Sequence, residues 1–128
     1  MGSIVKKNLL ALLMVLAASC VNQADEVTPQ ELHQVFETGR TVLVLDVREP
    51  DEWMAGHMIR AQSAPLSRFD QASQGLRPEQ EIYLYCHSGK RSMTALQMLK
   101  QRGFTHVKSL SGGIQAWKAQ VDPALNRY

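Results

Sequence analysis

The sequence predicts an α/β fold in which a central parallel sheet carries helices on both faces. Two apolar runs, at 41–47 and 81–85, have the length and the aliphatic, β-branched or aromatic composition of buried strands. Segments with apolar residues at helical spacing lie between and after these runs, and the connections are short. Strands that alternate with helices in this way pair in parallel. The 128 residues are enough for one such domain.

The first predicted helix has a full set of amino-terminal signals. Thr28 is expected to cap it, Pro29 to occupy its first position and Glu31 to complete a capping box. We expect the folded domain to begin with this helix and to cover residues 28–121. Residues 122–128 are then a C-terminal tail.

The first strand, at 41–47, ends beside the basic residue Arg48. Charged residues at the carboxyl end of a parallel strand lie where open α/β sheets build their sites, so Arg48 is a candidate site residue. A short helix is expected at 50–55, because a proline and an acidic first turn open it. The stretch 59–66 is expected to be extended, and 67–75 weakly helical.

The second strand, 81–85, leads directly into Cys86. An amphipathic helix is expected at 92–102. The third strand, 106–110, contains polar residues, which favours a position near the edge of the sheet. After a glycine turn, a last helix is expected at 114–119.

Cys86 has the surroundings of a reactive thiol. A cysteine between a strand and a helix lies at the helix N-terminus, where backbone N–H groups can surround the sulfur. Lys90 and Arg91 add positive charge, and Gly89 permits a tight loop. These features favour the thiolate. A free cysteine is more commonly a small buried hydrophobic residue, but packing alone gives no reason for two cations beside a core residue.

Residues 1–19 are expected to be an export signal to the periplasm. Lys6 and Lys7 precede an apolar run that is too short to span a bilayer, and small residues follow it. Cys20 comes next, in a segment similar to a bacterial lipobox. We expect Cys20 to be acylated and to anchor the protein through lipid, with 20–27 as a tether. Ordinary signal cleavage, which leaves a soluble periplasmic protein, is the alternative.

Charge and cysteine content narrow the function classes. Without the two lysines of 1–19, twelve of the fourteen basic residues remain against twelve acidic ones, so nothing favours a nucleic-acid partner. If Cys20 is acylated, Cys86 is the sole thiol, and thioredoxin-like chemistry lacks its second cysteine. Cys86, His57 and His87 form no recognised metal-ligand spacing, and no metal or cofactor is expected.

Four segments, in this order, resemble those of the single-domain rhodaneses, a family of sulfurtransferases. The resemblance covers residues 28–120 approximately. Met58 and Arg60 depart from the isoleucine and glycine that the family usually has there, which bears on the packing of one turn. The segments are 45–53 (LDVREPDEW), 56–61 (GHMIRA), 86–92 (CHSGKRS, in the C-x-x-G-x-R form) and 110–117 (LSGGIQAW).

The resemblance implies that Cys86 takes a sulfur from thiosulfate or a similar donor and passes it, as a persulfide, to a thiophilic acceptor such as cyanide or a small thiol. Lys90, Arg91 and Arg48 would attract an anionic donor. Pairing of Arg91 with a carboxylate is the open alternative for that residue. The partners are then small molecules. The loop residues expected to bind the donor are His87, Ser88, Gly89, Lys90 and Arg91.

By the same resemblance, a second set of residues is framework. His57 could take part in catalysis, but a histidine tied to a backbone carbonyl is the expectation. The framework set is Asp46, Gly56, His57, Gly112, Gly113 and Trp117.

Two other functions stay open. Phosphatase or arsenate-reductase chemistry also uses a cysteine before an anion-binding loop, but such phosphatases place the arginine one position further along than Arg91 is from Cys86. The shorter loop should close too tightly around a phosphate. A non-catalytic sulfur carrier, redox sensor or binding module on the same scaffold is the other alternative, because fold alone does not exclude it.

Overall fold

The computed structural model describes residues 23–125, and within this range five strands form one parallel sheet. The strand order is β1-β5-β4-β2-β3, so the strand that leads to Cys86 is the central one. The strands are β1 (Glu26–Val27), β2 (Leu43–Asp46), β3 (Gln62–Ser63), β4 (Ile82–Tyr85) and β5 (Val107–Leu110).

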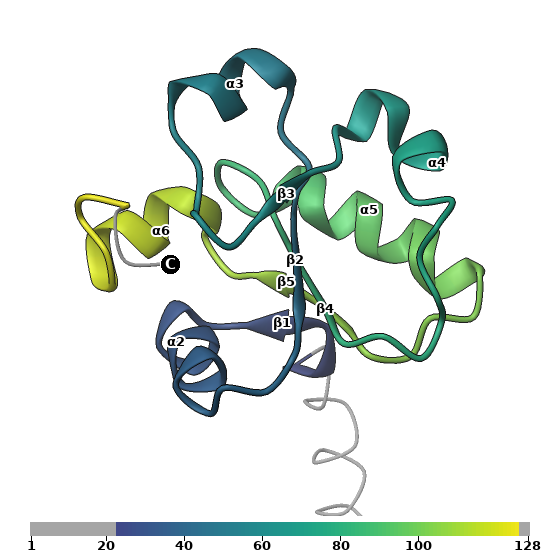
Figure 1. The fold of residues 1–128 in the computed structure, drawn as a ribbon, viewed down its shortest axis with the longest axis horizontal. Coiled ribbons are helices and arrows are strands. Elements are labelled where there is room, and N and C mark those ends of the chain that lie inside the picture. Colours follow the sequence, from purple (N-terminus) through teal and green to yellow (C-terminus); the bar gives the residue numbers. More distant parts are fainter. Residues whose placement is uncertain (1–22, 126–128) are drawn as a thin grey trace, which may run out of the picture.

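Helices cover both faces of the sheet, as the alternation of elements predicts. Figure 1 shows α4 and α5 on one side of the sheet and α2 and α6 on the other, while α3 lies beyond the carboxyl end of β2. The helices are α2 (Pro29–Glu37), α3 (Pro50–Ala55), α4 (Phe69–Ala72), α5 (Lys90–Gln101) and α6 (Gly113–Gln120), with 3-10 turns η1 (Gln23–Asp25) and η2 (Leu66–Arg68).

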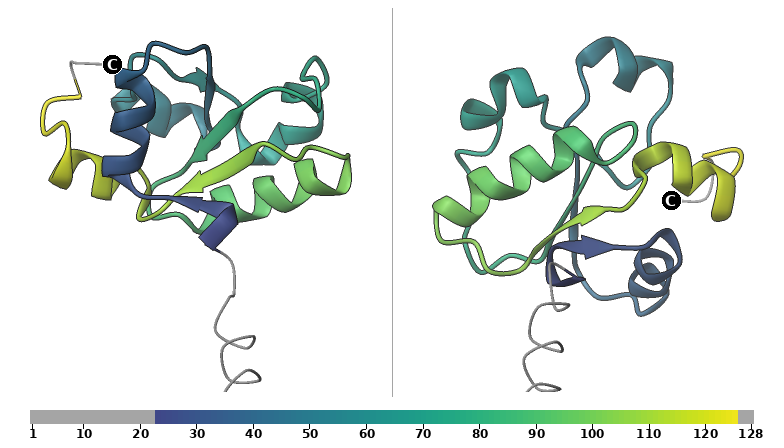
Figure 2. Two further views of the ribbon diagram at one scale, coloured as in Figure 1. Left: turned by 90° about the horizontal axis from the view of Figure 1, so that it is seen from below. Right: turned by 180° about the vertical axis from the view of Figure 1, so that it is seen from behind.

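Alternating side chains of the central strands build a separate core on each face. Leu84 and Cys86 join the core under α4 and α5, whereas Tyr83 and Tyr85 join the core under α2 and α6. The two layers of helices are seen from other directions in Figure 2. Because successive residues of a strand point to opposite faces, β4 alone determines that the cysteine side chain faces α5.

The predicted cap and first residue of the first helix are confirmed, whereas the Glu31 carboxylate accepts a hydrogen bond from the Thr28 hydroxyl at 2.9 Å instead of completing a capping box. The Glu31 N–H donates to Oγ1 of Thr28 at 3.1 Å, and Pro29 is the first helical residue of α2. This cap satisfies one of the backbone N–H groups that a helix N-terminus otherwise leaves unpaired.

The chain before Thr28 differs from the expected tether. Residues 23–25 form η1, and β1 pairs in parallel with β5, which places β5 one strand in from the edge of the sheet. Val27 is only 3% exposed, and Lys100 donates to Asp25 at 2.7 Å. A two-residue strand has no periodicity of its own, so the sequence carries no local signal for it.

The end of the described chain also packs on the domain. Asp122 is buried, its N–H donates to the carbonyl of Trp117, and Leu125 contacts the core under α2 and α6. The expected export signal and the lipid anchor at Cys20 lie outside the described residues, as do residues 126–128. Among residues 23–125, no helix is long and apolar enough to cross a membrane.

Candidate active site

The loop between β4 and α5 carries the cysteine. β4 ends at Tyr85, and α5 begins at Lys90 rather than at residue 92, so Lys90 and Arg91 belong to the first turn of the helix. Gly89 precedes that turn with a φ of 103°, a left-handed conformation that glycine adopts without steric cost. The chain therefore turns from strand to helix within four residues, 86–89.

The sulfur of Cys86 is enclosed by hydrogen-bond donors. The Gly89 N–H donates to Sγ at 3.1 Å, and the Ser92 hydroxyl lies 3.4 Å from it. Burial raises the pKa of the Cys86 thiol, but hydrogen bonds from the Ser92 hydroxyl and from the backbone N–H groups of Ser92, Gly89 and Ser88 outweigh burial. The pKa of Cys86 consequently lies below its ordinary value, as the sequence led us to expect.

A chain of buried hydroxyl groups supports this arrangement. Ser92 Oγ lies 2.7 Å from Oγ of Ser109 on β5, and both serines are buried. Ser92 also donates to the Gly89 carbonyl, at 3.2 Å. Each hydroxyl has a single proton, so when Ser109 donates to Ser92, the one Ser92 proton is shared between the Gly89 carbonyl and the sulfur.

The N-terminus of α6 holds the loop from behind. The Ile114 N–H donates to the Cys86 carbonyl at 2.8 Å, and the Gln115 N–H donates to the His87 carbonyl at 3.2 Å. A Cβ atom at Gly113 would overlap both carbonyl groups, so only glycine lets the helix approach this closely. With these carbonyl groups bound to α6, the loop is left with its N–H groups on the side of the sulfur.

Arg91 is paired with a carboxylate on another helix. Its Nη1 and Nη2 donate to the two carboxylate oxygens of Glu52 at 2.7 and 2.9 Å. The Arg91 guanidinium lowers the pKa of Glu52 to about 2. Glu52 also accepts a hydrogen bond from the Glu49 N–H at 3.2 Å, so the pair joins the start of α3 to the start of α5.

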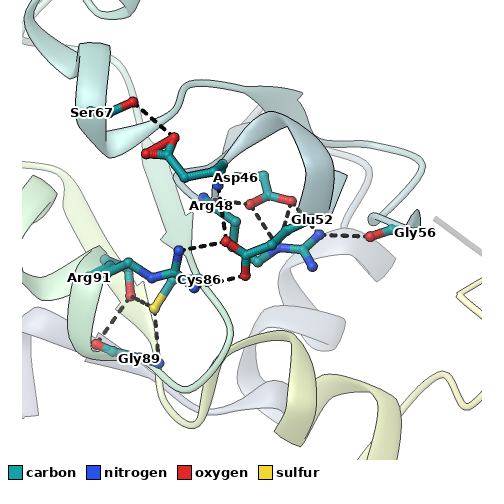
Figure 3. A network of polar contacts seen from close by, with 10 residues as sticks. Asp46, Arg48, Glu52, Gly56, Ser67, Cys86, Gly89 and Arg91 are labelled. Carbon is teal, nitrogen blue, oxygen red and sulfur yellow. Dashed lines mark hydrogen bonds and ion pairs between the residues drawn. The ribbon is translucent and has the colours of Figure 1, made fainter. Parts of the chain in front are cut away.

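Arg48 is held in the same way. Its Nε and Nη2 donate to the Asp46 carboxylate at 3.0 and 2.7 Å, and Nη2 also donates to the Gly56 carbonyl at 2.7 Å. Both side chains of this pair are buried. Figure 3 shows the Cys86 sulfur, the Arg91–Glu52 pair and the Arg48–Asp46 pair in one polar network.

The remaining predicted loop residues, His87, Ser88 and Lys90, are exposed at the surface. A pocket of about 590 Å³ opens beside His87 at the carboxyl edge of the sheet. A separate pocket of about 350 Å³ lies at the opposite edge, beside the amino ends of β4 and β5, and contains no part of the cysteine loop. The residues that line the pocket beside His87 include Arg48, Glu52, Gly56, His87, Gln115 and Lys118.

His57 lies in the turn after α3 and is tied to the backbone, as expected. Its Nδ1 is 2.8 Å from the Trp53 carbonyl, and its ring stacks on the Trp53 ring with 3.4 Å between centroids. Among the described residues there is no group of three or more histidine, cysteine, aspartate or glutamate side chains that could hold a metal ion.

Three contributors to the site were not singled out from the sequence: Glu52, Ser92 and Ser109. Ser92 had a local signal, because it stands in the first turn of the helix that follows the cysteine. Glu52 and Ser109 had none, because each reaches the loop from an element that is distant along the chain.

Comparison with known proteins identifies the family of this domain. The profile of the rhodanese-like domain matches residues 28–120. MoeZ of Mycobacterium tuberculosis, a probable adenylyltransferase/sulfurtransferase, is 37% identical over 109 residues, which cover 83% of this chain and 28% of MoeZ. YrkF of Bacillus subtilis, a putative sulfur carrier protein, is 29% identical over 97 residues, which cover 76% of this chain and 52% of YrkF.

The chain thus spans between about a quarter and about a half of these two relatives. A relative of similar length is found among solved structures. The human single-domain sulfurtransferase TSTD1 superposes with a TM-score of 0.71 and 26% sequence identity, over 76% of this chain and 97% of TSTD1.

Proposed function

We propose that this chain, which belongs to the rhodanese-like domain family, is a sulfurtransferase that carries sulfane sulfur as a persulfide on Cys86. The observation that carries the proposal is the cysteine loop itself. Its sulfur accepts a hydrogen bond from the Gly89 N–H and contacts the Ser92 hydroxyl. These contacts lower the pKa of a buried thiol. A purely structural cysteine has no use for donors that stabilise a negative charge.

The reaction proceeds in two displacements. With thiosulfate as donor, the Cys86 thiolate attacks the outer sulfur, the S–S bond breaks, and sulfite leaves with the bonding electron pair. The enzyme then holds Cys86–S–S⁻. In the second displacement, cyanide or a small thiolate attacks the terminal sulfur and the S–S bond to Cys86 breaks. The products are thiocyanate or a new persulfide and the restored Cys86 thiolate.

The loop supports both forms of the enzyme. The N–H groups that stabilise the thiolate lie on the side of the sulfur, where they also stabilise the negative charge of a persulfide. The contacts from Ile114 and Gln115 to the loop carbonyl groups keep this orientation in both states. We place the approach of donor and acceptor on the side of His87, where a pocket opens next to the cysteine loop.

A sulfur carrier is the second candidate, because YrkF is named as one. In that case Cys86 takes up one sulfur but hands it to another protein rather than to a small acceptor. The near-complete burial of Cys86, 1% exposed, favours a carrier whose sulfur is reached only by specific partners.

One series of measurements tests the proposal. The purified protein is incubated with thiosulfate, intact mass is used to detect one added sulfur, and thiocyanate is then measured in the presence of cyanide. Sulfur addition and turnover that both disappear in Cys86→Ser are expected. Absence of any adduct on the wild type, with thiosulfate and with an organic persulfide alike, would overturn the proposal. An adduct without turnover would support the carrier, and hydrolysis of an aryl phosphate would support phosphatase chemistry.

We also propose that the protein is exported to the periplasm and acylated at Cys20. The support is the charged, apolar and small-residue order of 1–19 and the cysteine that follows it. Metabolic labelling with a fatty acid should mark the wild type, and Cys20→Ala should lose the label. A wild-type protein that is unlabelled and found only in the soluble periplasmic fraction would refute the lipid anchor.

A further inference from the structure

The two arginine side chains of the site, Arg91 and Arg48, are already engaged by carboxylates. Arg91 makes a two-pronged ion pair with Glu52, and Arg48 makes one with Asp46. The sequence left two roles open for Arg91, attraction of an anionic donor or pairing with a carboxylate, and the structure shows the pairing. Arg48, expected to attract the donor, is likewise paired with a carboxylate of this same chain.

The Arg91–Glu52 pair bears directly on donor choice. A guanidinium binds a carboxylate or a sulfonate with a pair of parallel N–H groups, and Glu52 already occupies the Nη1/Nη2 pair of Arg91. Because the pKa of Glu52 is about 2, its carboxylate stays charged wherever the Cys86 thiolate exists. An oxyanion at Arg91 must therefore displace a negative charge or lie beside it.

Two lysines remain near the site, and they compensate only weakly. Lys90 is exposed on the first turn of α5, and Lys118 is exposed at the rim of the pocket beside His87. Charges on solvent-exposed side chains are screened by water and salt. The backbone N–H groups of Ser88, Gly89 and Ser92 stabilise the sulfur itself.

We infer that Glu52 is a specificity-determining residue that selects against the thiosulfate dianion and in favour of sulfane-sulfur donors without a sulfonate group, namely organic persulfides. The inference rests on the proposed sulfurtransferase function and names its donor class. The Cys86 thiolate attacks the terminal sulfur of R–S–SH, the S–S bond breaks, and R–S⁻ leaves with the bonding electron pair. The proton stays on the transferred sulfur, so the products are Cys86–S–SH and R–S⁻.

Glu52→Gln tests this role while keeping the shape of the side chain. A glutamine keeps the side-chain oxygen that accepts the Glu49 N–H, and it keeps the volume of the glutamate. It removes the charge that competes for Arg91. Asp51→Asn is the matched control, because it removes the same charge from an exposed position on the same helix.

The measurement is the second-order rate constant for sulfur addition to Cys86, followed by intact mass, with thiosulfate and with the persulfide of 2-mercaptoethanol. In Glu52→Gln we expect the thiosulfate constant to rise about tenfold or more while the persulfide constant changes less than about threefold. Asp51→Asn should leave the ratio of the two constants unchanged. An unchanged ratio in Glu52→Gln, or an equal fall with both donors, would show that the pair is only a structural link.

A second measurement uses the wild type alone and does not depend on the folding of a variant. If a free cationic site attracted thiosulfate, its rate constant would fall steeply as salt is added. We expect it to stay level or rise relative to the constant for the persulfide, which carries at most one negative charge. A steep fall would overturn the inference. Absence of a sulfur adduct with either donor would instead refute the proposed function.

Discussion

At the scale of single residues, the proposed reactivity of Cys86 depends on the hydroxyl group of Ser92, which lies six residues further along the chain. Ser92 contacts the sulfur at 3.4 Å and is supported by Ser109 at 2.7 Å. A hydrogen bond to a charged group contributes about 1.5–3 kcal/mol, more than one between neutral groups. The hydroxyl therefore stabilises the thiolate more than it stabilises the thiol.

Ser92→Ala should shift the pH dependence of persulfide formation. Without the hydroxyl the pKa of Cys86 rises, so the rate below the midpoint should fall about tenfold and the midpoint should move to higher pH. The pH profile of sulfur addition measures both effects. Ser73→Ala is the control, because Ser73 is equally buried but bonds to Phe69 on α4. Identical midpoints in wild type and Ser92→Ala would contradict this role for the hydroxyl.

Gly113 is a second residue on which the geometry of the site depends, because there is no space for a Cβ atom at this position. It has a φ of +61°, and a Cβ there would lie 2.5 Å from the Cys86 carbonyl oxygen. Gly113→Ala should therefore lose at least about 2 kcal/mol of stability, from backbone strain and overpacking, and should lose sulfur transfer as well. Urea unfolding and the mass assay measure the two effects.

Gly75 offers the comparison for that substitution. It has no atom within 4 Å of an added Cβ and no positive φ, so Gly75→Ala should be nearly neutral. Equal effects of the two substitutions would mean that the contact between α6 and the loop does not matter.

At the scale of elements, β1 extends the folded domain towards the N-terminus beyond the residues that the sequence assigned to it. Its two residues alternate between an exposed and a buried side chain, as a strand at the edge of a sheet requires. Residues 23–27 therefore belong to the folded unit and shield the open edge of β5.

Val27→Ala should lower the free energy of unfolding by about 2 kcal/mol, because Val27 is 3% exposed and packs in the core under α2 and α6. Glu26→Ala, on the exposed side of the same strand, should change it by less than about 0.5 kcal/mol. Urea unfolding at neutral pH gives both values. If 23–27 were a tether, neither substitution would have an effect.

At the scale of the whole molecule, an ion pair attaches a helix that buries little side-chain surface. α3 contains no buried residue, yet Glu52 ties it to α5 through Arg91. The pair thus holds α3 over the carboxyl edge of the sheet, where the pocket beside His87 is formed.

This link should make stability fall in acid. The folded pKa of Glu52 is about 2, below its reference value of 4.5, so its contribution is complete above pH 4.5 and is lost as the pH falls towards 2. We expect the wild type to lose about 1–2 kcal/mol more than Glu52→Gln between pH 7 and pH 3, after allowance for solvent screening. Urea unfolding at the two pH values measures the difference, and parallel losses would argue against the link.

The alternation of strands and helices after residue 28, the cap of α2 and the lowered pKa of Cys86 could all be predicted from the sequence. These features depend on neighbours along the chain: a proline after a capping threonine, an apolar run that ends in a cysteine, and two cations in the next helical turn. The four segments that resemble the rhodaneses are likewise local patterns. Local interactions are what a sequence states directly.

The tertiary structure decided everything that depends on elements distant along the chain. Glu52 meets Arg91 across 39 residues, Ser109 meets Ser92 across 17, and β1 pairs with a strand near the other end of the domain. From the sequence, Arg91 could bind either an anionic sulfur donor or a carboxylate of the protein. The approach of α3 to α5 in the folded structure brings Glu52 to Arg91. The physical reason is that charge compensation and burial are properties of what surrounds a side chain in space, which folding determines and local spacing does not.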